Sequence, residues 1–322
     1  MPSNTIRSVT ATINGVTYTL TPTQDGGYSA SGTAPAGSSF PLTGGYYPVS
    51  VRVEYDTGAA TVVNDETPGT LGQSCRLVVK EKVKPVTVIE SPTSGQYQTT
   101  ALQSVVFRIT DNNNGQSNGF SGVNVSSIRG SIVSVSKSIN ISFTGADVTS
   151  EAITGGYRFT YAISSGLPDA TDYVITINAS DNDGNAADAA SVSFVVDTTP
   201  PELSVTSPVE GLRTYSSLCP VEGVTSDITT SPVTLQIYLN DTLVETISGS
   251  GIAQDGSFST SVTFTTAGNN VVKVVATDTA GKTSTVSRNV FFSDSVPIIH
   301  SVTLVPNPVD GGTSFSIEVD VE

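Results

Sequence analysis

Residues 173–211 read YVITINASDNDGNAADAASVSFVVDTTPPELSVTSPVEG. The first eight alternate apolar with mostly polar side chains, which is the period of a half-buried β-strand. Asp181–Asn185 then offers turn chemistry, because Gly and Asn accept a positive φ and Asp bonds its own backbone. Ser191–Val196 returns as a second strand, and Pro200-Pro201 stops the pairing because proline has a fixed φ and no amide donor. The stretch therefore predicts a hairpin, a stiff linker and the first strand of a new unit.

The same pattern recurs at fixed distances along the chain. Four landmarks are matched 97 residues later without a gap: Asp181, Gly184, Asp197 and Pro200 by Asp278, Gly281, Asp294 and Pro297. Three more are matched 116 residues earlier: Pro201, Ser207-Pro208 and Gly211 by Pro85, Ser91-Pro92 and Gly95. A recurrence at about a hundred residues indicates tandem domains rather than one large fold.

Each full unit contains about seven short strands separated by turns, the pattern of an immunoglobulin-like β-sandwich. We therefore predict an all-β protein of tandem immunoglobulin-like sandwiches in an elongated array. The predicted divisions are a divergent sandwich at 1–84, sandwiches at 85–198 and 199–293, and an incomplete two-strand segment at 294–322. A two-stranded piece alone is marginal in water. Either the chain is cut short here, or these strands pack on the third domain or on another subunit by strand addition.

Charge and cysteine content narrow the classes of function. The 322 residues carry a formal net charge of −15, which argues against a phosphate-binding surface and so against nucleic acid as a partner. Acidity also keeps an elongated, strand-rich protein soluble. The two cysteines, Cys75 and Cys219, fall in different predicted domains, and Cys219 is expected to be a small buried hydrophobe. Nothing in this pattern requires an oxidising compartment.

The first twenty residues contain no apolar run of the length that a signal peptide needs, and no window approaches a membrane span. We therefore expect a chain that is neither exported by the usual signal nor inserted in a membrane. A trimmed mature fragment with an added Met remains an alternative.

Two stretches carry a family resemblance. Residues 179–211 and residues 276–297, the latter ATDTAGKTSTVSRNVFFSDSVP, resemble the bacterial immunoglobulin-like repeat in their last hairpin and D-x-x-P linker. The resemblance is specific over 86–293 and weaker over 5–85. Residues 297–322, PIIHSVTLVPNPVDGGTSFSIEVDVE, are similar to strand segments in tail and baseplate-associated proteins of phages of Gram-positive bacteria. Such repeats occur in adhesins, wall-enzyme spacers and virion proteins, so the resemblance implies a fold and a spacer or binding role.

The sequence does not favour catalysis. His300 is the one histidine, and no nucleophile motif accompanies it, whereas a serine or cysteine triad needs an imidazole base. Asp181 and Asp183 could in principle serve glycoside hydrolysis, but turn propensity already explains both. We predict no enzymatic activity.

Aspartates at one end of two predicted sandwiches suggest calcium. Asp111–Gly115 and Asp181–Gly184 supply the oxygen donors that calcium prefers. The second-to-third-strand loop and the last hairpin of such a sandwich lie at its N-terminal end, facing the preceding linker. In the third domain, carboxylates gather there without a cation, so the calcium candidates are Asp197, Glu202, Asp227 and Asp278. In the second domain, a lysine-rich linker could neutralise the aspartates without metal: Lys80, Lys82 and Lys84 facing Asp111, Asp181 and Asp183.

Two functional classes follow. The first is a non-enzymatic structural or accessory virion protein of a phage tail or baseplate, acting as a rigid spacer and weak binder of host cell-surface carbohydrate. The second is a fragment of a secreted surface adhesin or the spacer of a cell-wall enzyme. Expected partners are other tail proteins or further copies of the chain, joined through residues 294–322, with no membrane partner. The expected location is the virion, with the cell surface as the alternative.

Overall fold

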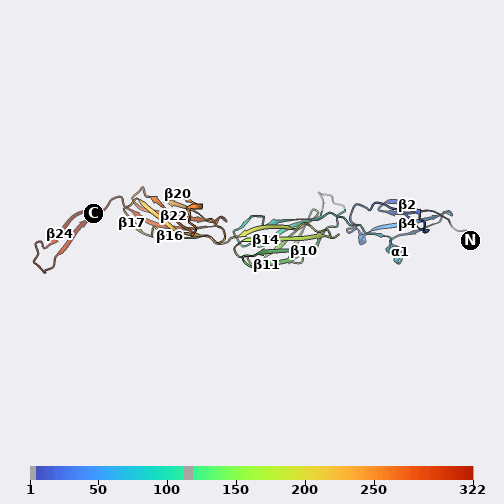
Figure 1. The fold of residues 1–322 in the computed structure, drawn as a ribbon, viewed down its shortest axis with the longest axis horizontal. Helices are drawn as coiled ribbons and strands as arrows, with labels where there is room; N and C mark the ends of the chain where they lie inside the picture. Colours follow the sequence, from blue (N-terminus) through green and yellow to red (C-terminus); the bar gives the residue numbers. More distant parts are fainter. Residues whose placement is uncertain (1–4, 112–118, 322) are drawn as a thin grey trace. The chain divides into compact units, whose positions relative to one another are not determined.

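The computed structural model describes residues 5–111 and 119–321, which are built largely of β-strands (Figure 1). The predicted all-β class is therefore confirmed. The chain divides into two compact units, residues 1–196 and 197–322. The first unit contains the first two predicted domains, and the second contains the third domain and the terminal segment. The finer boundaries at residues 84, 198 and 293 stay predictions.

Residues 5–84 form one sheet, drawn in blue in Figure 1. Asn14 and Gly15 have φ values of 46° and 77° and form a tight hairpin turn, the conformation that an Asn-Gly pair favours. The sequence analysis expected the two sheets of a sandwich. Between its strands, however, this region is rich in Gly, Ser, Thr and Pro and forms loops and a short helix, α1 (Thr70–Gln73). The sheet order is β3 (Tyr28–Ser29), β2 (Val16–Pro22), β1 (Ile6–Ile13), β4 (Tyr47–Tyr55), β5 (Ala60–Val63), with β6 (Arg76–Leu77) also on β4.

Residues 86–196 form an immunoglobulin-like sandwich of two sheets. One has the order β12 (Val148–Ile153), β13 (Gly156–Ala162), β9 (Ser104–Thr110), β7 (Val86–Ser91). The other has the order β11 (Ile139–Thr144), β10 (Val123–Ser134), β14 (Ala170–Asp181), β15 (Ala190–Val196), β8 (Tyr97–Gln98). This arrangement separates the first, second, fifth and sixth long strands from the third, fourth, seventh and eighth, as in immunoglobulin-like sandwiches.

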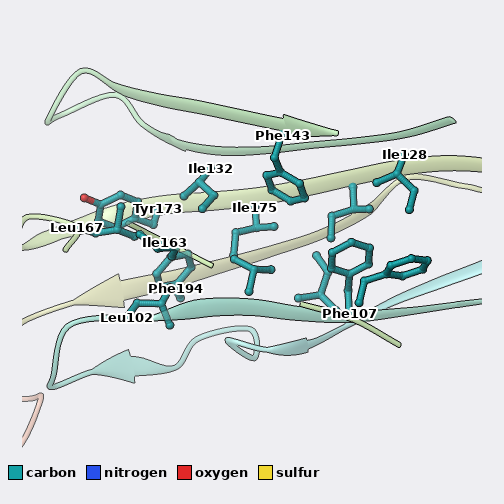
Figure 2. Packing of buried hydrophobic residues seen from close by; sticks show 14 of the residues in the cluster. Leu102, Phe107, Ile128, Ile132, Phe143, Ile163, Leu167, Tyr173, Ile175 and Phe194 are labelled. Carbon is teal, nitrogen blue, oxygen red and sulfur yellow. The ribbon is translucent and has the colours of Figure 1, made fainter. Parts of the chain in front are cut away.

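The core of this sandwich lies between its sheets (Figure 2). Phe107 stacks on Phe159 with ring centroids 5.2 Å apart, and Tyr173 stacks on Phe194 at the same distance. The Tyr173 hydroxyl donates a hydrogen bond to the Pro168 carbonyl oxygen at 2.9 Å. Tyr173 lies near the start of β14, and a tyrosine at this place that bonds backbone a few residues upstream is the tyrosine corner of immunoglobulin-like domains.

Residues 202–292 form a second sandwich of the same kind. The turn at Asn240-Asp241 has φ values of 49° and 62° and joins two antiparallel strands, and Cys219 is buried as predicted. One sheet has the order β16 (Glu202–Ser207), β18 (Leu218–Ser226), β21 (Ser257–Thr263). The other has the order β17 (Leu212–Thr214), β23 (Thr283–Phe292), β22 (Gly268–Thr277), β19 (Thr234–Leu239), β20 (Thr242–Ile247).

The terminal segment is a two-stranded hairpin made of β24 (Ile299–Val305) and β25 (Ser316–Val321). The sequence predicts strands at 299–305 and 314–321; the first has these bounds, and the second begins two residues later than expected. Across the described residues, the helices are too short and too polar to span a membrane.

Candidate metal centres

Two groups of three carboxylates gather among the described residues. The first triad is Glu81, Asp111 and Asp181, and the second triad is Asp197, Asp227 and Asp278. Within each triad, one carboxylate oxygen from every residue lies within 4.8 Å of the others. Two oxygens bound to one calcium ion at about 2.4 Å lie no more than about 4.8 Å apart, so this spacing suits a shared cation.

Equivalent parts of the two sandwiches supply the triads. The first member precedes the first strand of its sandwich. The second member, Asp111 or Asp227, follows the second long strand, β9 or β18. The third member, Asp181 or Asp278, stands at the end of β14 or directly after β22, where the last hairpin begins. Because immunoglobulin topology puts these three segments at one end of the sandwich, the carboxylates converge.

Hydrogen bonds satisfy most oxygens of the first triad. Asn185 donates through its side-chain amide to Glu81 Oε1 at 3.0 Å and to Asp181 Oδ2 at 2.7 Å. Asp111 Oδ2 accepts the Gly122 N–H at 2.6 Å. Asp111 Oδ1, in contrast, is buried without a hydrogen-bond partner. A buried carboxylate oxygen with no partner is costly, and a cation would satisfy it.

The carboxylates of the first triad carry like charges that repel one another. Burial, together with the hydrogen bond and charge of Asp181, raises the pKa of Glu81 to about 7. Burial also raises the pKa of Asp111, with added repulsion from Asp181 and Asp183. Three buried carboxylates therefore need protons or a bound cation to coexist.

The second triad has the same character. Asp197 Oδ2 accepts a hydrogen bond from the Thr230 hydroxyl, and Asp278 Oδ1 accepts the Lys282 N–H at 2.8 Å. Asp278 Oδ2 is buried and has no hydrogen-bond partner. Burial raises the pKa of Asp278, and repulsion from Asp197 and Asp227 adds to the effect. Asp227 is half-buried, which leaves this triad a side open to solvent.

The donor chemistry fits calcium. The triads offer carboxylate oxygens, which are the hard ligands that calcium takes six to eight at a time, with water completing the set. They contain no histidine or cysteine, the ligands that zinc favours. The residues that would hold the ion are therefore those of the two triads.

The other residues singled out in the sequence lie around the triads. Glu202 is exposed at the start of β16 and is not a member of the second triad; its carbonyl oxygen accepts a hydrogen bond from Thr225. Residues 112–115, counted among the sequence's oxygen donors, lie outside the described residues. Asp183 binds the linker instead of the triad, because its Oδ2 accepts the Glu81 N–H at 2.9 Å.

The linker lysines contact the last hairpin of the second domain. Lys80 Nζ donates to the Asp183 carbonyl oxygen at 3.2 Å, and Lys84 pairs with Asp188 at 2.7 Å. Lys82 is exposed. These cations lie on the surface, whereas the linker residue that enters the acidic cluster is Glu81, itself acidic. The sequence analysis missed Glu81 because three lysines surround it. Glu81 aligns with the linker residue Asp197 of the next domain, and that alignment could have identified Glu81 as a member of the triad.

Part of the second unit matches a known protein family. Residues 201–293 match the family described as Glucodextranase, domain B. No curated protein matches the chain. Among solved structures, a tetra-tandem repeat in the extending region of a large adhesion protein has 17% identity over 100% of this chain and 81% of its own, with a TM-score of 0.36.

Two further solved structures are similar at the same level. Fibronectin(III)-like modules of Clostridium thermocellum CbhA share 13% identity over 65% of this chain and 94% of theirs, with a TM-score of 0.34. The D00-D0 domain of intimin shares 12% identity over 65% of this chain and 100% of its own, with a TM-score of 0.27. At these values the likenesses add no argument to the fold described above.

Proposed function

We propose that this chain is a non-catalytic spacer built of immunoglobulin-like domains, and that calcium bound in the two triads holds each linker against the sandwich that follows it. The observation that carries the proposal is the repetition of one arrangement. Linker, loop and hairpin each contribute a carboxylate in both sandwiches, and each triad contains one buried oxygen without a partner, on Asp111 and on Asp278. A single acidic turn is common by chance, whereas carboxylates that converge from three segments in both sandwiches favour a bound ligand.

A cation in each triad would turn mutual repulsion into attraction. The ion would bind the linker carboxylate and two carboxylates of the sandwich at once, so the linker would no longer move independently of that sandwich. A spacer needs such junctions, because free linkers let successive domains reorient.

The test measures thermal unfolding of the full chain after removal of metal by EDTA, with and without millimolar calcium. We expect calcium to raise the unfolding temperature, since a ligand at about 100 times its Kd stabilises by ~2.7 kcal/mol. Asp278→Asn should remove the response of the second triad, and Asp111→Asn that of the first. Glu202→Gln and Asp188→Asn neutralise nearby exposed acids outside the triads and serve as matched controls. An unfolding temperature that calcium leaves unchanged would contradict the proposal.

The setting of the spacer is a separate question. The resemblance of residues 297–322 to strand segments of tail proteins favours a virion, whereas the repeat that residues 86–293 resemble also occurs in adhesins and wall-enzyme spacers, which favours a cell surface. We therefore propose a spacer exposed on a particle or a cell surface. Peptide mass spectrometry of sedimented particles and of the washed surface fraction from the source strain distinguishes the two. Peptides confined to the surface fraction would exclude the virion.

A further inference from the structure

The terminal hairpin repeats the first two long strands of the preceding sandwich. β16 and β18 pair antiparallel, with ten residues between the end of one and the start of the other. β24 and β25 also pair antiparallel, again across ten residues, and each pair contains one register shift. The connecting segments share a motif, Pro208-Val209-Glu210-Gly211 in one and Pro308-Val309-Asp310-Gly311 in the other. The hairpin therefore has the strand pairing of one layer of a sandwich.

The opposite layer is missing from the described residues. In the preceding sandwich, the inner face of β16 and β18 lies in a core, where Val205 and Val221 are buried. The corresponding hairpin face is apolar yet exposed. Directly opposed pairs on it are Val302 with Val319 and Leu304 with Ile317. The exposed fractions of its members are 62%, 58%, 40%, 61%, 48% and 52% for Ile299, Val302, Leu304, Ile317, Val319 and Val321.

Apart from Val305, which pairs with Ser316, the other face of the hairpin is polar. Ser301 pairs with Asp320 and Thr303 with Glu318, so both acidic side chains of β25 point away from the apolar face. Two hairpins that meet through their apolar faces would thus leave all four acidic groups in water. The contact would bury no like charges, and each hairpin would cover the exposed apolar face of the other.

The exposed area suits a weak, self-complementary contact. Six partly exposed aliphatic side chains leave on the order of 400–600 Å² per copy in water, so pairing two faces would bury roughly 1,000 Å², near the lower limit for a specific interface. An interface of this size would dissociate at concentrations on the order of 1–100 µM.

We propose that the apolar face of β24 and β25 docks on the same face of a second copy of this chain, so that two hairpins complete a small two-layered sandwich. The contact is isologous, with the same residues on both sides. It does not depend on calcium in either triad.

The test is sedimentation equilibrium of the full chain from about 1 to about 200 µM, a range that spans the expected affinity. We expect a monomer–dimer equilibrium in calcium and in EDTA alike. Val319→Lys places a charge on the apolar face and should shift the equilibrium to monomer. Thr303→Lys places the same charge on the polar face, opposite Glu318, and should leave the dimer intact. A wild-type chain that stays monomeric throughout, or a dimer that persists in Val319→Lys, would overturn the proposal.

A second measurement covers the case in which Val319→Lys unfolds the hairpin. Val319→Cys should form a disulfide-linked dimer under mild oxidation, and Thr303→Cys should not. The native cysteines, Cys75 and Cys219, are buried and would not compete. Equal cross-linking of the two variants would show that the apolar face is not the interface.

Discussion

Asp181 and Asp278 occupy the same position in successive sandwiches and differ by one hydrogen bond. At each, the residue four positions later donates its backbone N–H to Oδ1 at 2.8 Å. That residue is Asn185 in the first case, and its side-chain amide also donates to Asp181 Oδ2 at 2.7 Å. It is Lys282 in the second case, and Asp278 Oδ2 is left without a hydrogen-bond partner. In the second triad, Asp278 Oδ2 is therefore available to bind a cation. In the first triad, the Asn185 amide already satisfies the equivalent oxygen of Asp181.

This difference predicts the effect of Lys282→Asn. An asparagine there can donate to Asp278 Oδ2 as Asn185 does to Asp181, so the metal-free protein should gain about 1–2 kcal/mol of stability. The calcium-dependent rise in unfolding temperature should shrink, because calcium would now compete with an internal donor. Lys282→Ala removes the lysine without supplying an amide and is the matched control. Calorimetry in EDTA and in calcium measures both effects, and an equal response of the two variants would contradict the explanation.

Calcium in the first triad should protect the linker from trypsin. Lys80 and Lys82 are exposed, and Glu81 between them is a triad member. Lys84 precedes Pro85 and should resist cleavage. Cutting after Lys80 or Lys82 requires the linker to leave the sandwich, so every ~1.4 kcal/mol of added stability should slow it about tenfold.

The reference for this digestion lies in the same chain. Lys137 is exposed in the turn after β10, at the end of that strand opposite to the one that pairs with Asp181, so its cleavage reports any effect of calcium on trypsin itself. Mass spectrometry gives the rate of linker cleavage, after Lys80 or Lys82, divided by the rate of cleavage after Lys137. This ratio should fall on calcium addition in the wild type and stay constant in Asp111→Asn. A ratio that calcium does not change in the wild type would count against a linker held by the first triad.

The turns and half-buried strands of this structure could be predicted from local sequence patterns. Turns such as Asn14-Gly15 and Asn240-Asp241 need residues that tolerate a positive φ, and alternation reveals the half-buried strands between them. β8 and β17 escaped prediction because strands of two or three residues show no period, and their parallel pairing with the last strand of each sandwich is a tertiary contact. Glu81 escaped for a related reason, since the segments it meets are 30 and 100 residues away in sequence.

Tyr173→Phe tests the tyrosine corner. The hydroxyl is the donor to the Pro168 carbonyl oxygen, and Tyr173 is fully buried. Loss of this bond leaves a carbonyl unsatisfied at nearly constant volume, so the free energy of unfolding of the first unit should fall by about 1–2 kcal/mol. Tyr97→Phe removes a hydroxyl from a tyrosine that is 43% exposed and should change stability by less than about 0.5 kcal/mol. Urea denaturation measures the difference, and equal losses would argue against a structural role for the bond.

Alkaline titration gives an independent measure of the same hydroxyl. Burial, together with the charges of Asp172 and Asp169, raises the pKa of Tyr173 to about 12, while an unfolded chain releases the proton near 10. The folded state thus binds this proton more tightly, so its contribution to stability is fully present below pH ~10 and is lost as the pH rises through about 12. Tyr173→Phe retains every other ionisable group and is therefore the reference for this comparison. The wild-type free energy of unfolding should therefore fall more steeply than that of Tyr173→Phe between pH 10 and 12. Parallel curves would mean that Tyr173 titrates alike in both states and that its hydroxyl is not held in the core.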